Sequence, residues 1–288
     1  RYRPEFLFSL HNEAFGGCYY YLTEPLEPLH GTLQSLPEDH GVPLRRGEPE
    51  WFGAEAFDDA VFSLRTFADQ YEAARDDDGV APEDVLFGGT AYDYASRFRD
   101  DVVEFVVELP YFADPRIGDD TELDRTREAV LREGVEARLA VVEEVRTALD
   151  PVAEHLPETP MAREAAGVFP YFEGEYEAKR EWAADAAETN VPATVAGRLD
   201  ERYLKGYHLL TYLGMLLRSV DRAAMRAEGE PRGELLAAKA ALGDVFHERI
   251  GELRSAVDYE AVPIRDLVAI QARAGLLCLD YRQRDDGG

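Results

Sequence analysis

The chain has 288 residues, 45% of them hydrophobic, so it is long enough to bury a core and global disorder is excluded. Its formal net charge is −27, and only three of its 31 basic residues are lysines. A carboxylate-rich surface stays hydrated in concentrated salt, where screening removes the repulsion between like charges. Composition therefore predicts a halophilic protein in a high-salt cytosol, with an ordinary acidic cytosolic protein as the alternative.

Several classes of partner are excluded by the same data. No basic stripe is present to displace counterions, so nucleic acid is not an expected partner. Cys18 and Cys278 are the only cysteines and provide neither a disulfide framework nor a CxxC metal cluster. The longest apolar stretch, around Leu209 to Leu217, is far shorter than the ~20 residues that span a bilayer. A cytoplasmic location without membrane association is expected. The absence of a signal peptide before the first predicted strand carries no argument for it, because the sequence begins with Arg1 and not Met.

Residues 1–118 alternate apolar strands with helices and predict an α/β domain with a mixed sheet. Glu5 to Leu10 is predicted as a buried strand, and Cys18 to Leu22 as a second strand after a turn at Phe15 to Gly17. Asp101 to Leu109 is predicted as a third strand that ends at Pro110.

Helices are expected between these strands, over part of Pro25 to Leu36 and over Ala54 to Ala74. The run Arg75 to Gly79, which holds three consecutive aspartates, is predicted to end the second helix as a solvated loop.

Residues 119–288 are predicted to be a helical bundle or helical appendage without strands. Apolar residues recur every three or four positions from Leu131 to Val152, which is typical of a helix with one buried face. Asp120 or Thr121 is the expected N-terminal cap of this helix, and Pro151 its end. Further helices are expected over three stretches: Leu199 to Val220, Gly233 to Leu253 and Ile264 to Tyr281.

His11 is predicted to stand at the end of the first strand, where it opens into the glycine turn. Side chains at strand ends often form the active sites of α/β enzymes, because the strand fixes the side chain while the loop admits substrate. Neutral imidazole is also a common zinc ligand. His11 is therefore a candidate metal ligand.

Glu108 ends the third strand, on the same face as Glu104 and Val106 by strict alternation. A carboxylate at the end of an apolar strand has to be solvated, paired or functional. Glu108 is accordingly a candidate general base, with a solvated carboxylate at the rim as the alternative.

These two segments together resemble the zinc-dependent metallocarboxypeptidase family, including its bacterial and archaeal peptidase branches. The first segment is Leu10 to Leu22, LHNEAFGGCYYYL, and the second combines Ala91 to Ala95, AYDYA, with Val107 to Phe112, VELPYF. The resemblance covers about residues 6–117 and implies part of an α/β/α carboxypeptidase-like domain. It also implies that His11 is a ligand of one Zn²⁺, that Glu108 is the general base, and that Asp93, with Tyr92 beside it, binds the substrate side chain.

The chain departs from this family pattern at the metal site. In the family, an HxxE-type motif supplies the first two zinc ligands, and an arginine binds the substrate carboxylate. Both precede the histidine that His11 resembles. None of residues 1–10 can fill these roles, so the remaining ligands are expected upstream of Arg1. The HxxE match from His155 to Glu158 is rejected because Pro157 interrupts it and the order is reversed.

The resemblance implies a metallopeptidase, a hydrolase that cleaves a C-terminal peptide bond in a peptide or acyl-amino-acid substrate. The alternative on the same scaffold is a zinc deacylase or amidase of the desuccinylase or aspartoacylase type. A further alternative is a non-catalytic binding module that has lost its metal.

Overall fold

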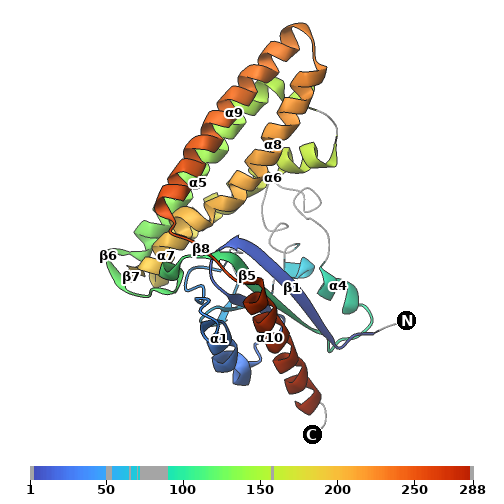
Figure 1. Cartoon of the computed structure of the whole chain (residues 1–288), viewed down its shortest axis with the longest axis vertical. Coiled ribbons are helices and arrows are strands. Elements are labelled where there is room, and N and C mark those ends of the chain that lie inside the picture. Colours follow the sequence, from blue (N-terminus) through green and yellow to red (C-terminus); the bar gives the residue numbers. More distant parts are fainter. Residues whose placement is uncertain are drawn as a thin grey trace. The chain divides into compact units, whose positions relative to one another are not determined.

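The computed structural model describes residues 3–49, 54–64, 66–69, 71, 90–156 and 159–285. The chain divides into two compact units, Arg1–Asp120 with Tyr259–Gly288, and Thr121–Asp258 (Figure 1). The division near residue 120 lies close to the predicted boundary at 118. The last helix, α10 (Ile264–Asp285), was expected in the helical region, but it packs on the sheet of the first unit.

The first unit is built on a mixed sheet of six strands. Strand order is β1-β5-β2-β4-β3, and β8 pairs with β5. The strands β1 and β5 are parallel, as are β2 and β4, whereas the pairs β2–β5, β3–β4 and β5–β8 are antiparallel. The predicted α/β class with a mixed sheet is thus confirmed. The strands are β1 (Phe6–Phe15), β2 (Tyr19–Leu22), β3 (Ala56–Asp58), β4 (Val61–Ser63), β5 (Val103–Ala113) and β8 (Glu260–Ala261).

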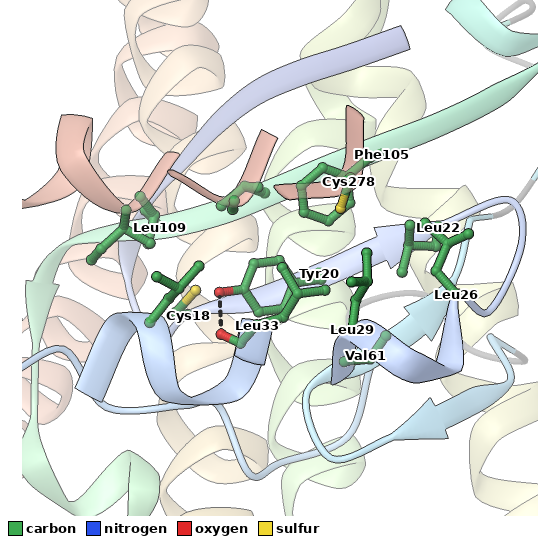
Figure 2. Close-up of a cluster of buried hydrophobic side chains, with 14 of the residues drawn as sticks. Cys18, Tyr20, Leu22, Leu26, Leu29, Leu33, Val61, Phe105, Leu109 and Cys278 are labelled. Carbon is green, nitrogen blue, oxygen red and sulfur yellow. Dashed lines mark hydrogen bonds between the residues drawn. The ribbon is translucent and has the colours of Figure 1, made fainter. Parts of the chain in front are cut away.

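Two helices cover one face of this sheet and enclose an apolar cluster (Figure 2). The helix α1 (His30–Glu38), preceded by the 3₁₀ turn Glu27–Leu29, contributes Leu33 and Leu36, and α10 contributes Ile270 and Cys278. These side chains meet the apolar face of β2 and β5, and the Tyr20 hydroxyl donates to the Leu33 carbonyl at 2.7 Å. Burial raises the pKa of both cysteine thiols to about 12, so they stay protonated at neutral pH.

The turn between β1 and β2 lies at the predicted residues, Phe15 to Gly17, and it requires a glycine. A side chain on Gly17 would place its Cβ 2.6 Å from the backbone nitrogen of Arg45 and 2.8 Å from the backbone of Leu44. The chain crosses itself here, with the Cys18 N–H donating to the Pro43 carbonyl at 2.8 Å. Glycine at this position therefore allows a close approach that no other residue permits.

The first and the third predicted strands, β1 and β5, are both longer than expected. β1 runs to Phe15, and its side chains are partly or fully exposed because it forms an edge of the sheet, so the prediction of a short buried strand was wrong. β5 continues through Pro110 to Ala113, so the prediction that Pro110 ends the strand was also wrong. The β2 pairing stops at Glu108, and Pro110 lies beyond it, where a missing N–H is tolerated.

The helix predicted over Ala54 to Ala74 was wrong in its first half. Residues 56–63 form the β3–β4 hairpin, whose Val61 and Phe62 are buried in the sheet. Helical geometry is present at 67–69 and 71. The remainder of this prediction, with the acidic loop at Arg75 to Gly79, lies outside the described residues.

The second unit is a four-helix bundle, which confirms the mainly helical character of this region (Figure 1). The helix α5 (Arg127–Leu149) packs against α6 (Pro160–Asp185) and α9 (Gly229–Ala256), and α8 (Gly206–Arg226) packs against the same two helices. Pro151 ends α5 as predicted, in the 3₁₀ segment Asp150–His155.

Strands are not absent from this unit, contrary to expectation. β6 (Glu122–Thr126) pairs with β7 (Pro192–Thr194) in a two-stranded ribbon. Because β6 occupies the residues before α5, the cap is Thr126, whose hydroxyl accepts from the Ala129 N–H, and not Asp120 or Thr121. The short helix α7 (Val195–Leu199) follows β7 and continues through the π-helical turn Asp200–Leu204 into α8. No helix among the described residues is long and apolar enough to cross a membrane.

Candidate active site

One face of the sheet carries a row of polar side chains from β1 and β5. Phe6 and Phe8 of β1 face the apolar cluster, and alternation turns Ser9, His11 and Glu13 to the opposite face.

His11 lies beside Glu108 in the parallel register of β1 and β5. The His11 Nδ1 and Glu108 Oε1 atoms are 2.8 Å apart, although 97 residues separate them in sequence. The structure therefore brings together the two residues that the sequence predicts as metal ligand and general base. His11 is not at a strand end, however, because β1 continues for four residues beyond it, to Phe15.

The two partners differ in exposure to solvent. The Glu108 side chain is 11% exposed and the His11 side chain 56% exposed. β5 lies between β1 and β2, and the buried Tyr19 is the β2 residue opposite Glu108. On β1, the Gln271 side-chain amide of α10 donates to the His11 carbonyl at 3.0 Å. The pair thus consists of a fixed, nearly buried carboxylate and an imidazole that solvent reaches.

The contact through Nδ1 defines what the imidazole can do. When Nδ1–H donates to the Glu108 carboxylate, the ring lone pair is on Nε2, the form that binds a metal or accepts a proton. When Nδ1 instead carries the lone pair, a metal bound there would lie beside the Glu108 carboxylate. Both arrangements suit hydrolytic chemistry, and they assign Glu108 different roles.

Glu104 lies on the same face of β5, four residues before Glu108 and about 13 Å from it along the strand. Its carboxylate accepts from the Ser9 hydroxyl at 2.8 Å and from the Tyr92 backbone N–H at 2.9 Å. The start of the helix α4 (Ala91–Ala95) is therefore attached to the polar face of the sheet. This contact places Tyr92 and Asp93 beside Glu104, not beside the His11–Glu108 pair.

Asp93 is engaged in local hydrogen bonds at the start of α4. Its carboxylate accepts from the Thr90 backbone and hydroxyl at 2.7 Å each, while the Thr90 hydroxyl accepts from the Asp93 N–H. This reciprocal arrangement is a capping box that stabilises the first turn of a helix. The Phe67 N–H also donates to Asp93 at 3.1 Å. The specificity role of Asp93 and Tyr92 remains a prediction.

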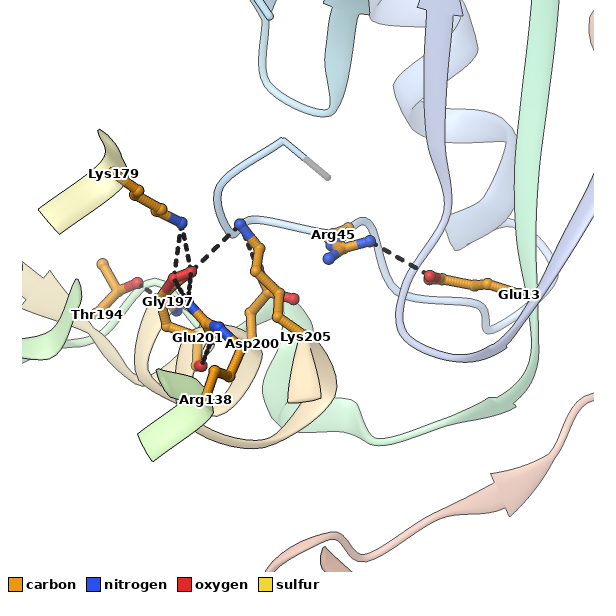
Figure 3. Close-up of polar contacts among 9 residues, drawn as sticks. All are labelled: Glu13, Arg45, Arg138, Lys179, Thr194, Gly197, Asp200, Glu201 and Lys205. Atoms are coloured by element: carbon orange, nitrogen blue, oxygen red, sulfur yellow. Dashed lines mark hydrogen bonds and ion pairs between the residues drawn. The ribbon is translucent and has the colours of Figure 1, made fainter. Parts of the chain in front are cut away.

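A second charged pair on this face was missed by sequence reasoning. The Arg45 guanidinium donates to the Glu13 carboxylate at 3.3 Å (Figure 3). It also lies 4.8 Å from the centre of the Tyr19 ring. Arg45 is 3% exposed. Alternation from His11 could have placed Glu13 on this face. The position of Arg45 has no local signal, because it depends on the chain crossing at Gly17.

The described residues alone do not fit a resident zinc ion. Zinc enzymes use about three protein ligands and keep one open position. No group of three or more His, Cys, Asp or Glu side chains that could hold a metal occurs in the part of the chain that the structure describes. His11 supplies one candidate ligand. His155, from the rejected HxxE match, lies in the helical unit 3.6 Å from Glu234, and Pro157 and Glu158 are outside the described residues.

Comparison with known proteins adds no assignment: no family model matches the chain, and searches of curated proteins and of solved structures give no significant match.

Proposed function

We propose that the protein is a hydrolase of the metallocarboxypeptidase type that cleaves a C-terminal peptide bond or a related amide. In this proposal the sheet unit is part of an α/β/α carboxypeptidase-like domain. His11 is one metal ligand, and Glu108 is the general base that takes a proton from the attacking water and passes it to the leaving amine. The observation that carries the proposal is the 2.8 Å contact between His11 and Glu108 across β1 and β5.

The environment of Glu108 supports this role. A general base must be held in place yet reach the reacting water, and the Glu108 carboxylate is fixed on a central strand beside an accessible imidazole. The proposal requires two further metal ligands that the described residues do not supply. The lack of these ligands among the described residues favours a second candidate function, a binding module in which the His11–Glu108 pair persists without a metal.

The decisive variant is Glu108→Gln in the full-length protein, purified in molar potassium chloride. Gln is nearly isosteric and keeps one acceptor oxygen, so the fold is expected to survive. If Glu108 is the base, kcat on a peptide with a free C-terminus falls by ~10²–10⁴ while bound zinc is unchanged. If Glu108 only orients His11, zinc affinity falls by about 10- to 100-fold instead.

Glu104→Gln is the matched control, because Glu104 lies on the same strand and face but away from His11. It is expected to leave kcat within about twofold, and His11→Ala is expected to remove most of the zinc. Zinc that is retained in His11→Ala would exclude His11 as a ligand. A wild-type protein that binds no zinc and hydrolyses no peptide or acyl-amino acid would favour the binding module.

A further inference from the structure

The core of the helical unit contains a cluster of buried charges around Glu201. Glu201 lies in the π-helical turn and is 1% exposed. Its carboxylate accepts from Lys179 of α6 at 2.8 Å and from Arg138 of α5 at 3.3 Å, and the Lys205 Nζ lies 3.3 Å away (Figure 3). Burial by itself would raise the pKa of Glu201, but Lys205, Lys179 and Arg138 outweigh it and hold the pKa well below its usual value.

A glycine on α5 lets the π-helical turn approach. A Cβ on Gly134 would lie 2.6 Å from the Glu201 carbonyl oxygen. One turn later on α5, Arg138 donates to that same carbonyl. π-Helical turns interrupt the regular ladder and occur frequently at functional sites. Arg202, within this turn, lies 3.8 Å from Glu252 of α9.

A pocket of about 50 Å³ lies within this unit, between α5, the π-helical turn with α8, and α9. Arg138, Arg202 and Arg249 line it from these three elements, and Glu252 is the acidic residue among the lining side chains. Three arginines thus line one small space, and two of them are also paired with carboxylates: Arg138 with Glu201, and Arg249 with Glu144 and Glu252.

These arginines retain unused hydrogen-bonding capacity. Arg138 is 4% exposed, and among the residues that the structure describes its Nε and that of Arg249 have no hydrogen-bond partner. Arg202 lies 3.8 Å from the carboxylates of Glu133 and Glu252, which is too far for a hydrogen bond. A buried donor without a partner is unfavourable, so a bound acceptor would stabilise this arrangement.

The size of the pocket limits what the acceptor can be. One buried water needs a cavity volume of ~10–15 Å³. The pocket of about 50 Å³ therefore has room for about three to five oxygen atoms. The planar guanidinium group matches the paired oxygens of phosphate or sulfate. We propose that the pocket between α5, α8 and α9 binds a small tetrahedral oxyanion. This inference is independent of the proposed hydrolase function.

Isothermal titration with inorganic phosphate, at constant ionic strength in molar potassium chloride, tests the proposal. We expect saturable binding of one phosphate per chain, with sulfate competing for the same site. Arg202→Gln is expected to weaken binding by about tenfold or more. Arg198→Gln, an exposed residue of α7 in the same unit, should leave the affinity unchanged.

The absence of saturable binding, or equal affinity in wild type and Arg202→Gln, would overturn the proposal. Arg202→Lys covers the case in which Arg202→Gln does not fold, since it keeps the charge but loses the paired donors. It should also bind phosphate more weakly than wild type, and wild-type affinity in a folded Arg202→Lys protein would likewise overturn the proposal.

Discussion

At the scale of single residues, the structure shows two ways of keeping a carboxylate inside the protein. Glu108 is nearly buried but pairs with an accessible imidazole, so it remains connected to solvent. Glu201 is enclosed by Lys179, Lys205 and Arg138. The first arrangement suits proton transfer. The second balances buried charge, and removal of one partner leaves the others uncompensated.

Glu201→Gln is expected to destabilise the helical unit by about 3–5 kcal/mol, because it leaves buried cations without their counter-charge. The measurement is the free energy of unfolding from denaturant titration at constant salt. Asp221→Asn is the matched control, since the Asp221 and Lys239 side chains are 43% and 44% exposed. An exposed pair contributes about 0–1 kcal/mol, so similar losses in both variants would contradict the prediction.

The stability difference between wild type and Glu201→Gln has a defined pH dependence. The folded pKa of Glu201 lies below the ordinary value of 4.5, so near that pH the unfolded state binds more protons than the folded state. Its stabilisation is therefore complete above the ordinary value and is lost as the pH falls towards the folded pKa. The stability difference between wild type and Glu201→Gln should be constant near neutral pH and shrink in acid. A difference that instead grows in acid would contradict this sign.

At the scale of elements, close backbone approaches decide where helices and turns lie. Gly17 permits the crossing that positions Arg45, and Gly134 permits the contact between α5 and the π-helical turn. Alanine is the better helix former by about 1 kcal/mol, so propensity alone would favour it at position 134. The contact with the Glu201 carbonyl outweighs that preference.

Gly134→Ala is accordingly expected to destabilise the protein by about 1–3 kcal/mol, because the added Cβ forces α5 and the turn apart. Gly174→Ala on α6 is the control. Apart from the adjacent backbone of its own helix, nothing lies within 4 Å of its added Cβ, and stabilisation by up to about 1 kcal/mol is expected. Thermal and denaturant unfolding of both variants provide the test. Equal stabilisation by the two substitutions would show that the approach at Gly134 is not tight.

At the scale of the whole molecule, the net charge of −27 acts on both units. Like charges repel over about 10 Å at 0.1 M salt but only about 3 Å at 1 M. Arginine and carboxylate pairs are frequent on the surface, yet each exposed pair contributes little. Bulk screening, not individual ion pairs, should therefore govern stability.

We expect the melting temperature to rise from low salt to molar potassium chloride and then to level off as screening becomes complete. Differential scanning calorimetry over this range provides the measurement. A melting temperature that does not change would contradict the halophilic interpretation. A rise that continues without levelling would indicate surface hydration as the cause, not screening.

The sequence by itself determined the elements whose signals are local. Hydrophobic periodicity gave α5, α8, α9 and α10, and the glycine turn after β1 gave β2. Alternation along β5 placed Glu104 and Glu108 on one face. These predictions succeeded because neighbouring residues set helix and strand periodicity.

Only the tertiary structure decided how these elements combine. Pairing with β5 extended β1 to Phe15, and pairing with β7 moved the start of α5 to Arg127. The contact of His11 with Glu108 depends on the register of two strands 97 residues apart. The buried cluster at Glu201 depends on three helical segments, α5, α6 and the π-helical turn. Pairing and burial join residues that no sequence window contains, so their energies are set by the folded arrangement and not by local preference.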